Sequence, residues 1–157
     1  MIRTVIHQPD FLPWIGFFDK IQKVDQFIIL DDVQFSRRGW THRDKIKINN
    51  NFKWLTIPVK KKNKYHQLIR DVQIEDIYST KKNHINLIKE AYKESNNFEE
   101  IFPSLQRIYN KNYNYLIDLN IDLIKLFCEL LQIDKKYIFS SRANVTSKSS
   151  ERLIQLL

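Results

Sequence analysis

The sequence predicts an α/β fold in which a small, mostly parallel sheet is followed by a helical second half. Two short apolar runs, at residues 4–7 and 27–30, are separated by an apolar repeat of helical spacing, a pattern typical of a strand–helix–strand unit. The second half contains longer apolar repeats of helical spacing, which predict helices. Because a crossover helix returns the chain to its starting side, both strands are expected to end at the same edge of the sheet.

The first half begins with the strand at residues 4–7, which is too short to alternate, as is typical of a buried parallel strand. Pro13 begins the predicted helix, because proline suits the first helical position. Gly16 inside this helix indicates that a ligand or a neighbouring strand approaches its backbone closely. Residues 27–30 form the next strand, and residues 36–44 a polar loop.

The rest of the chain continues as a strand, a turn and several helices. Pro58 cannot donate a hydrogen bond to a sheet, so the strand predicted at residues 53–59 lies at an edge or ends there. Residues 113–131 are apolar on most sides but carry charges, which indicates a buried helix rather than a membrane span. The other predicted elements are a hairpin partner at 69–74, a helix capped by Ser79 or Thr80, a helix opened by Pro103, a strand at 137–139 and a last helix from Glu151.

Length and composition limit the class of protein. A chain of 157 residues predicts a single domain, residues 1–157. One cysteine excludes an internal disulfide and a cysteine-rich zinc cluster, and two glycines exclude the GxGxxG and GxxxxGKS/T phosphate loops. No apolar stretch approaches the roughly 20 residues that span a bilayer, and no signal peptide is recognisable, so we expect a cytoplasmic protein without a membrane span.

The formal net charge of +8 suggests an anionic partner. The lysines are scattered and form no basic helix stripe with regular aromatic interleaving, so a solvated surface explains them better than a nucleic-acid partner does. The arginines that follow the second strand favour instead a small phosphorylated substrate. The sequence does not determine the oligomeric state.

Polar side chains gather where the first two strands end. His7 can act as a general base at neutral pH, with Gln8 and Asp10 in the same loop. Asp31 and Asp32 face opposite sides of an extended chain, so one carboxylate can bind an ammonium, a sugar hydroxyl or Mg²⁺ while the other bonds to an arginine. We predict His7, Asp31 and Asp32 as catalytic. The alternative is purely structural, with backbone groups satisfying the histidine and the carboxylates capping the strand.

A basic loop follows the second strand. Guanidinium groups bind phosphate oxygens in pairs and an indole can stack on a base or a sugar, so this loop is predicted to hold phosphates. A second anion site is predicted where the last helix begins. The predicted substrate-binding residues are Gln8, Asp10, Trp14, Gln34, Arg37, Arg38, Trp40, Arg43, Arg142, Ser149 and Arg152, with Lys148 and Ser150 beside the last three. The alternatives are a solvated basic loop and serines that only cap the helix.

Other reactive side chains are predicted to be structural. No HExxH, CxxC, EF-hand or nucleophile-elbow motif occurs, so no metal site is predicted, and metallohydrolase, redox and serine-hydrolase functions have no support. His66 and His84 are isolated and are predicted to lie on the surface or in packing contacts. Cys128 stands among apolar residues and is predicted to be an inert buried thiol.

Four segments, HQPDFLPWIGFFDKI, FIILDDVQFSRRGW, WLTIPV and SERLI, resemble the WbqC-like family in the same order. The resemblance runs from His7 to Ile154 and implies a bacterial protein of surface-polysaccharide (O-antigen, lipopolysaccharide) biosynthesis, with a suggested role in transferring glycine onto a sugar. The chain departs from the family pattern at residues 42–44, His-Arg-Asp, where an Asn-Arg-Asn-like triplet is usual, and near Thr80, where a tryptophan is expected. Family members continue beyond SERLI, so a final strand–helix segment is expected to be missing.

A second resemblance concerns architecture alone. A strand that ends in a Gln-Pro loop, a helix and a strand that ends in acidic residues are similar to the Rossmann-like, HIGH-type nucleotidyltransferases. The Ser/Thr/Lys-rich loop before the last helix stands where those enzymes hold phosphates. Their HxGH signature is absent, and the segment Pro13-Trp14-Ile15-Gly16-Phe17 takes its place.

The leading hypothesis is a transferase that moves a group, for instance a glycyl or other acyl group, onto a nucleotide sugar or glycan precursor. The arginines of the basic loop would bind phosphates, Asp31 or Asp32 would orient the acceptor, and His7 would remove its proton. No nucleophile is evident, so the acyl donor would be activated elsewhere or as an adenylate, which makes ATP and Mg²⁺ the candidate cofactors. The alternatives are a nucleotidyltransferase-like enzyme with an altered motif and a non-catalytic nucleotide- or nucleic-acid-binding protein.

Overall fold

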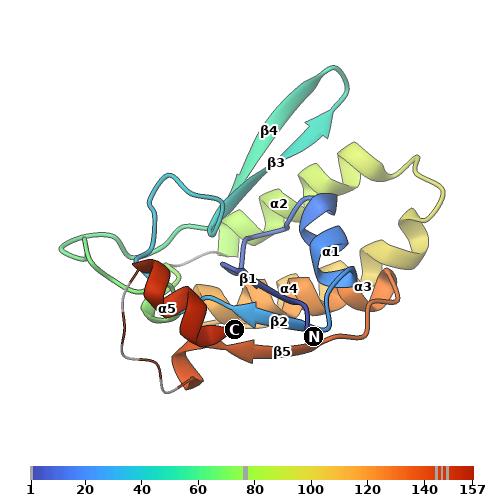
Figure 1. Cartoon of the computed structure of the whole chain (residues 1–157). Coiled ribbons are helices and arrows are strands. Elements are labelled where there is room, and N and C mark those ends of the chain that lie inside the picture. Colours follow the sequence, from blue (N-terminus) through green and yellow to red (C-terminus); the bar gives the residue numbers. More distant parts are fainter. Residues whose placement is uncertain (1, 76–77, 144, 146, 148) are drawn as a thin grey trace.

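A parallel sheet of three strands forms the centre of the first half. In the computed structural model, which describes residues 2–75, 78–143, 145, 147 and 149–157, the strands are β1 (Thr4–His7), β2 (Gln26–Ile29) and β5 (Lys136–Phe139), in the order β1–β2–β5 (Figure 1). The register aligns His7 with Ile29 and Ile29 with Phe139, so all three strands end together. This confirms the predicted α/β class with a small parallel sheet.

One face of the sheet packs on two helices, α1 (Ile15–Gln22) and α4 (Leu116–Leu130). Phe27 and Ile29 point to this face because they alternate along β2, and both are almost fully buried. Phe17 and Phe18 of α1 complete the cluster, and the ring of Phe17 meets that of Phe27 edge-on at 5.7 Å. These aromatic contacts fix the helix that follows the loop after β1.

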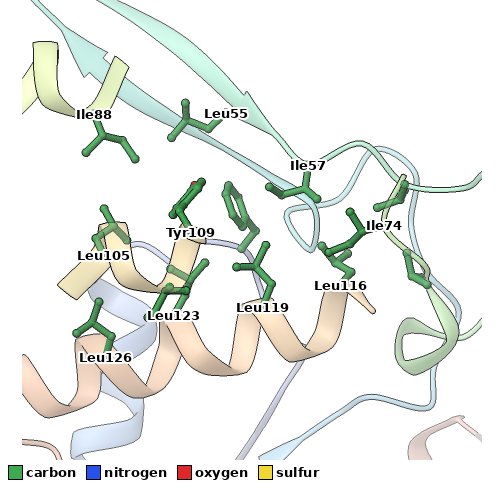
Figure 2. Packing of buried hydrophobic residues seen from close by; sticks show 14 of the residues in the cluster. Leu55, Ile57, Ile74, Ile88, Leu105, Tyr109, Leu116, Leu119, Leu123 and Leu126 are labelled. Atoms are coloured by element: carbon green, nitrogen blue, oxygen red, sulfur yellow. The ribbon is translucent and has the colours of Figure 1, made fainter. Parts of the chain in front are cut away.

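Helix α4 joins two hydrophobic clusters because it carries two apolar stripes. Ile117, Ile121 and Ile124 face the sheet cluster. The second stripe, spaced three and four residues apart, faces a larger cluster formed with the hairpin and with other helices. Figure 2 shows this stripe, Leu116, Leu119, Leu123 and Leu126, packed against Leu55, Ile57, Ile88, Leu105 and Tyr109.

An antiparallel hairpin of β3 (Arg43–Ile48) and β4 (Asn51–Thr56) projects from the body of the molecule (Figure 1). Asn49 in its turn has a φ of 53°, a left-handed conformation that asparagine tolerates better than most residues. The remaining elements are η1 (Ile69–Asp71), α2 (Tyr78–Tyr92), α3 (Phe98–Asn110), η2 (Ser140–Arg142) and α5 (Ser149–Leu156). Helix α2 lies against β3 at the base of the hairpin.

Strand β3 was not predicted, and its neighbours differ from the prediction as a result. Residues 36–44 are not all loop, because Arg43 and Asp44 already belong to β3. The strand predicted at 53–59 runs instead from Asn51 to Thr56, where it pairs with β3. In the hairpin partner predicted at 69–74, the first three residues form the 3-10 turn η1 instead, and only Ile74 pairs with Val59 in an isolated bridge.

Helix α1 begins at Ile15 with Trp14 as its N-cap, so Pro13 precedes this helix and does not open it, and α5 begins at Ser149, two residues before Glu151.

Two other helix starts also differ from the prediction. Helix α2 already includes Ser79 and Thr80, so neither caps it. Helix α3 begins at Phe98 and contains Pro103 in its interior. The acidic first turn of α3 suits the positive end of the helix dipole, and the ring of Phe98 stacks on that of Phe102 at 4.6 Å. These contacts stabilise the first turn of α3, which precedes Pro103 and was not part of the predicted helix.

Candidate functional site

The turns that follow β1 and β2 lie side by side at the carboxyl edge of the sheet. The backbone N–H of Leu30 donates to the carbonyl of His7 at 2.9 Å. The loop that begins at His7 and the turn that begins at Asp31 are therefore adjacent, as expected for two parallel strands joined by a helix. Open α/β sheets bind ligands at this edge.

The imidazole of His7 is held by its own loop. Its Nδ1 lies 2.9 Å from the carbonyl oxygen of Gln8 and 3.8 Å from Oδ2 of Asp10. Its ring meets Phe17 edge-on at 5.0 Å. A carbonyl can only accept, so Nδ1 carries the proton in the neutral ring and donates to Gln8. The lone pair is then on Nε2, which suits a general base, and 29% of the side chain is exposed.

A second carboxyl group, Asp44, stands near Asp10. Burial raises the pKa of Asp10, and the charge of Asp44 raises it further, while His7 and Lys20 act in the opposite direction. Burial also raises the pKa of Asp44. A pair of partly buried carboxyl groups beside a histidine is a common arrangement for proton transfer or for binding a cation. Sequence analysis missed Asp44, although the alternation RDKIKI could have revealed the strand that carries it.

The carboxylate of Asp31 is buried and fully engaged in hydrogen bonds. Ser141 donates to both of its oxygens, from the backbone N–H at 2.9 Å and from the hydroxyl at 2.6 Å. The hydroxyl of Ser140 lies 3.0 Å from Asp31 Oδ1 and 2.6 Å from Asp32 Oδ1, and it accepts from the backbone N–H of Asp31. Asp31 therefore ties the end of β5 to the end of β2. The two serines were not predicted as site residues.

Asp32 forms an ion pair with Arg152 of α5. The side chains are 12% and 18% exposed, and Nη2 of Arg152 donates to Oδ2 of Asp32. The Nε donor of Arg152 has no partner among the described residues. This pair brings the start of the last helix to the edge where β2 ends. It is a bond between one of the two aspartates and an arginine, as the sequence predicted.

The three arginines of the basic loop do not point toward one common binding site. Arg37 donates to the carbonyl of Lys61 at 2.8 Å and lies over the ring of Tyr65 at 4.1 Å. Arg43 donates to the carbonyl of Arg38 at 2.8 Å and lies over a different ring, that of Trp54. Arg38 itself is exposed. The loop uses two of its guanidinium groups to hold its own backbone.

The other predicted substrate-binding residues are distributed between the edge and the loops. Gln34 donates to the carbonyl of Tyr65 at 3.1 Å, and the ring of Trp40 lies 5.7 Å from that of Trp54. Arg142 is exposed at the end of η2, with its guanidinium 5.0 Å from the ring of Phe139. Ser149 is the first residue of α5 and Lys148 lies outside the described residues.

The exposed indole of Trp14 lies over Gly16. A Cβ atom added to Gly16 would be 2.0 Å from the indole ring, so only glycine leaves room for it. A side chain of the same loop therefore approaches Gly16, and not the ligand or the neighbouring strand that the sequence predicted. Trp14 is 64% exposed and so remains accessible to solvent.

Two pockets flank the sheet and the hairpin. One of about 570 Å³ lies between α4 and the strands β2 and β5, and no predicted site residue lines it. The other, of about 340 Å³, lies between α2, α3 and β3, and its apolar wall includes Leu12, Pro13 and Ile46. Asp44 of the carboxyl pair also lines this pocket. Within residues 2–75, 78–143, 145, 147 and 149–157, no group of three or more His, Cys, Asp or Glu side chains is arranged to hold a metal ion.

Comparison with known proteins identifies the family. The sequence is 34% identical over 157 residues to "Uncharacterized protein Rv1507c" of Mycobacterium tuberculosis. The aligned region covers 99% of this chain and 68% of that protein. No solved structure matches. Across the described part of the chain, every helix is too short or too polar to cross a membrane. The family model of the WbqC-like proteins matches residues 8–157, and the chain therefore belongs to the WbqC-like protein family.

Proposed function

We propose that this protein transfers an acyl group, glycyl in the simplest case, onto an amine or hydroxyl of a nucleotide sugar or glycan precursor during assembly of bacterial surface polysaccharide. We place the reaction in the cytoplasm and the reacting groups at the carboxyl edge of the sheet. The observation that carries the proposal is the position of His7, whose Nδ1 is fixed by the Gln8 carbonyl and whose Nε2 is left to accept a proton.

The carboxyl pair supports binding of an amine acceptor. An ammonium group near Asp10 and Asp44 would favour the ionised form of both, because an opposite charge offsets the cost of burial. Loss of one proton from this ammonium to water then leaves a nucleophilic amine, and its second proton is the one that His7 takes during transfer. The apolar pocket behind Asp44 offers room for a part of the acceptor that carries no charge.

The acyl donor would arrive already activated. The lone cysteine, Cys128, is on α4 in the 570 Å³ pocket, and burial raises the pKa of its thiol, so it is a poor nucleophile. With an acyl adenylate as donor, the acceptor nitrogen forms a bond to the carbonyl carbon and the bond from that carbon to the phosphate oxygen breaks. AMP leaves with the electron pair, and the acceptor proton moves to Nε2 of His7.

Phosphate binding is assigned first to Arg142, which is exposed beside the carboxyl end of β5. Arg152 is a weaker candidate because it is paired with Asp32. Arg37 and Arg43 are weaker candidates because each already donates to a carbonyl group. The alternative of nucleotidyl transfer has less support, since the indole of Trp14 fills the space against Gly16 in the segment that replaces the HxGH signature.

The test is a transfer assay preceded by a ligand screen. Nucleotides, nucleotide sugars and aminoacyl adenylates are first screened by thermal shift, and the ligands that raise Tm are then combined in a transfer assay read by mass spectrometry. Loss of a general base costs about 10²- to 10⁴-fold in rate, so His7→Gln should lower kcat by that factor without lowering Tm by more than a few degrees. The matched control is His66→Gln, because His66 is exposed and outside the edge.

The assay also separates the alternatives. Transfer that is equally fast in His7→Gln and in the control would remove His7 from the chemistry. A product that carries a nucleotidyl group instead of an acyl group would replace the proposal by the nucleotidyltransferase alternative. Binding of a nucleotide sugar with no turnover under any donor would leave only the binding function.

A further inference from the structure

The projecting hairpin has one face built from cationic and aromatic side chains and one threonine. In an antiparallel hairpin, two residues that lie opposite each other on the paired strands are on the same face. Successive residues along each strand point alternately to this outward face and to an inner face. Three cations on β3 stand opposite two aromatic residues and one threonine on β4. The outward face consists of Arg43, Lys45, Lys47, Phe52, Trp54 and Thr56, and we call it the hairpin platform.

The rings and cations of the hairpin platform are in direct contact. The ammonium of Lys45 lies 4.0 Å from the centre of the Phe52 ring and 4.7 Å from that of Trp54. The guanidinium of Arg43 lies 4.5 Å from the ring of Trp54. Trp40, at the base of the hairpin, extends the aromatic surface, since its ring is 5.7 Å from that of Trp54 and tilted by 31°. Cations held over rings keep both in place before a ligand arrives.

These aromatic rings are accessible. Phe52 is 60% exposed, Trp40 51% and Trp54 40%, although aromatic side chains of this size are mostly buried in folded proteins. Figure 1 shows the tip of the hairpin projecting beyond α2, the helix that lies against β3. A contiguous exposed aromatic surface is a typical interaction site.

The composition of the hairpin platform favours one class of partner. None of its six residues is acidic, so it attracts a polyanion. None is aliphatic, because Ile46, Ile48 and Leu55 are on the inner face and buried in the core. The tip, residues 49–51, is three asparagines. A hairpin that inserted into a bilayer would present apolar groups at its tip, and this one does not.

We propose that the hairpin platform binds single-stranded nucleic acid. Bases stack on Phe52, Trp54 and Trp40, and the phosphates between them contact the guanidinium and ammonium groups of β3. Stacking on aromatic rings combined with a line of cations is how proteins bind single strands without sequence preference. Along β3 the platform residues alternate with Asp44 and so face away from the carboxyl pair, and this inference does not depend on the proposed transferase activity.

The direct test is fluorescence anisotropy of labelled 12-nucleotide RNA and DNA single strands with the full chain. With three cations neutralising phosphates, the logarithm of the association constant should fall with the logarithm of salt concentration with a slope of about −2. Phe52→Ala, at a largely exposed ring, should weaken binding about five-fold or more. Lys47→Glu should weaken it further.

A charge-matched control is present on the same hairpin. Lys53 is exposed and neighbours Phe52 in sequence, but it stands opposite Ile46 and so belongs to the other face. Lys53→Glu makes the same change in net charge as Lys47→Glu and should retain clearly more binding. Circular dichroism and Tm of each variant establish that the hairpin is folded. Equal losses in the two variants would reduce the effect to net charge and overturn the proposal.

Three further ligands separate the alternatives. If AMP or UMP binds as tightly as a 12-mer, the proposal that the ligand is single-stranded nucleic acid is wrong and the platform is a nucleotide site. Co-sedimentation with phosphatidylglycerol vesicles that Phe52→Ala abolishes, without oligonucleotide binding, would assign the platform to membranes. No oligonucleotide binding at 50 mM salt would also overturn the proposal, whereas length-dependent binding of single strands lost in Lys47→Glu supports it.

Discussion

The side-chain amide of Asn120, in the middle of α4, donates a hydrogen bond of 2.8 Å to the carbonyl of Pro9 in the loop after β1. The same nitrogen donates to the carbonyl of Thr41 at 2.7 Å, and Asn120 is completely buried. One amide on the central helix therefore holds the loop that carries His7 and Asp10 against the segment that leads into β3. The candidate site depends on this contact for its shape.

Replacement of Asn120 should weaken the fold and the site together. Asn120→Leu keeps the number and branching of the side-chain heavy atoms but leaves two buried carbonyl groups without a donor, so the free energy of unfolding should fall by about 2 to 4 kcal/mol. Urea denaturation measures the change. Asn110→Leu, at an exposed position of α3, is the control and should change the free energy of unfolding by less than about 0.5 kcal/mol. A similar small change at Asn120 would show that these hydrogen bonds contribute nothing.

Asp10→Asn should stabilise the protein while reducing its activity. Burial and the charge of Asp44 raise the pKa of Asp10 above its value in the unfolded chain, so the stability contributed by protonated Asp10 is lost as pH rises through the folded pKa. An amide removes that cost at neutral pH, and the Tm at pH 7 should rise. Asp134→Asn, at an exposed aspartate, should leave Tm unchanged. A lower Tm in Asp10→Asn would mean that the ion pair with His7 outweighs burial.

Gly16→Ala should move the indole of Trp14 without unfolding α1. The new methyl group would overlap the end of the indole ring, and an exposed ring can swing away at little cost. Alanine also favours a helix by about 1 kcal/mol over glycine, so Tm should rise slightly. The emission of Trp14, isolated by replacing the other tryptophans with phenylalanine, should shift. In the Trp14→Ala background, Gly16→Ala should show only the gain from helix propensity, and an equal gain in both backgrounds would argue against the contact.

Stability should decrease below about pH 6.5 because two histidines are buried in the neutral form. Burial lowers the pKa of His84 to about 4, and burial together with Lys61 and Arg43 lowers the pKa of His42 to about 4. The unfolded chain binds these protons near pH 6.5, so the free energy of unfolding falls between about pH 6.5 and 4, by up to about 3 kcal/mol for each histidine.

A variant isolates the contribution of His84. Its Nε2 accepts from the backbone N–H of Thr56 at 3.1 Å and its Nδ1 lies 3.3 Å from the hydroxyl of Tyr109. A glutamine can still accept from Thr56 but does not titrate, so urea melts of His84→Gln between pH 7.5 and 4.5 should show a flatter curve. His66→Gln should behave as the parent protein. An unchanged slope in His84→Gln would assign the acid sensitivity to other groups.

Apolar runs were sufficient to predict much of the fold. Residues 4–7, 27–30 and 137–139 are short and apolar and are bounded by polar residues, and each is a strand of the parallel sheet. Strand β3 was missed because its outward residues are all charged, so charge alone suggested a loop. The inward residues Ile46 and Ile48 would have shown the period of two.

The candidate site was less accessible to sequence reasoning. The meeting of the His7 and Asp31 turns follows from strand order, which a βαβ unit dictates. The separation of Arg37 from Arg43 depends on Tyr65 and Trp54, which are distant in sequence and offer rings that no local pattern predicts. The hydrogen bonds between Asp31 and Ser141 join residues 110 positions apart, and only the tertiary fold brings them together.

The pairing of β2 with β5 has a consequence for synthesis of the chain. Gln26 pairs with Lys136, so a central strand lacks one neighbour until Lys136 has been translated. At ribosomal speeds of about 5 to 20 residues per second, that interval lasts on the order of 5 to 20 seconds. During this time the nascent protein exposes one unpaired edge of β2, and we expect a chaperone that binds extended apolar segments to recognise it.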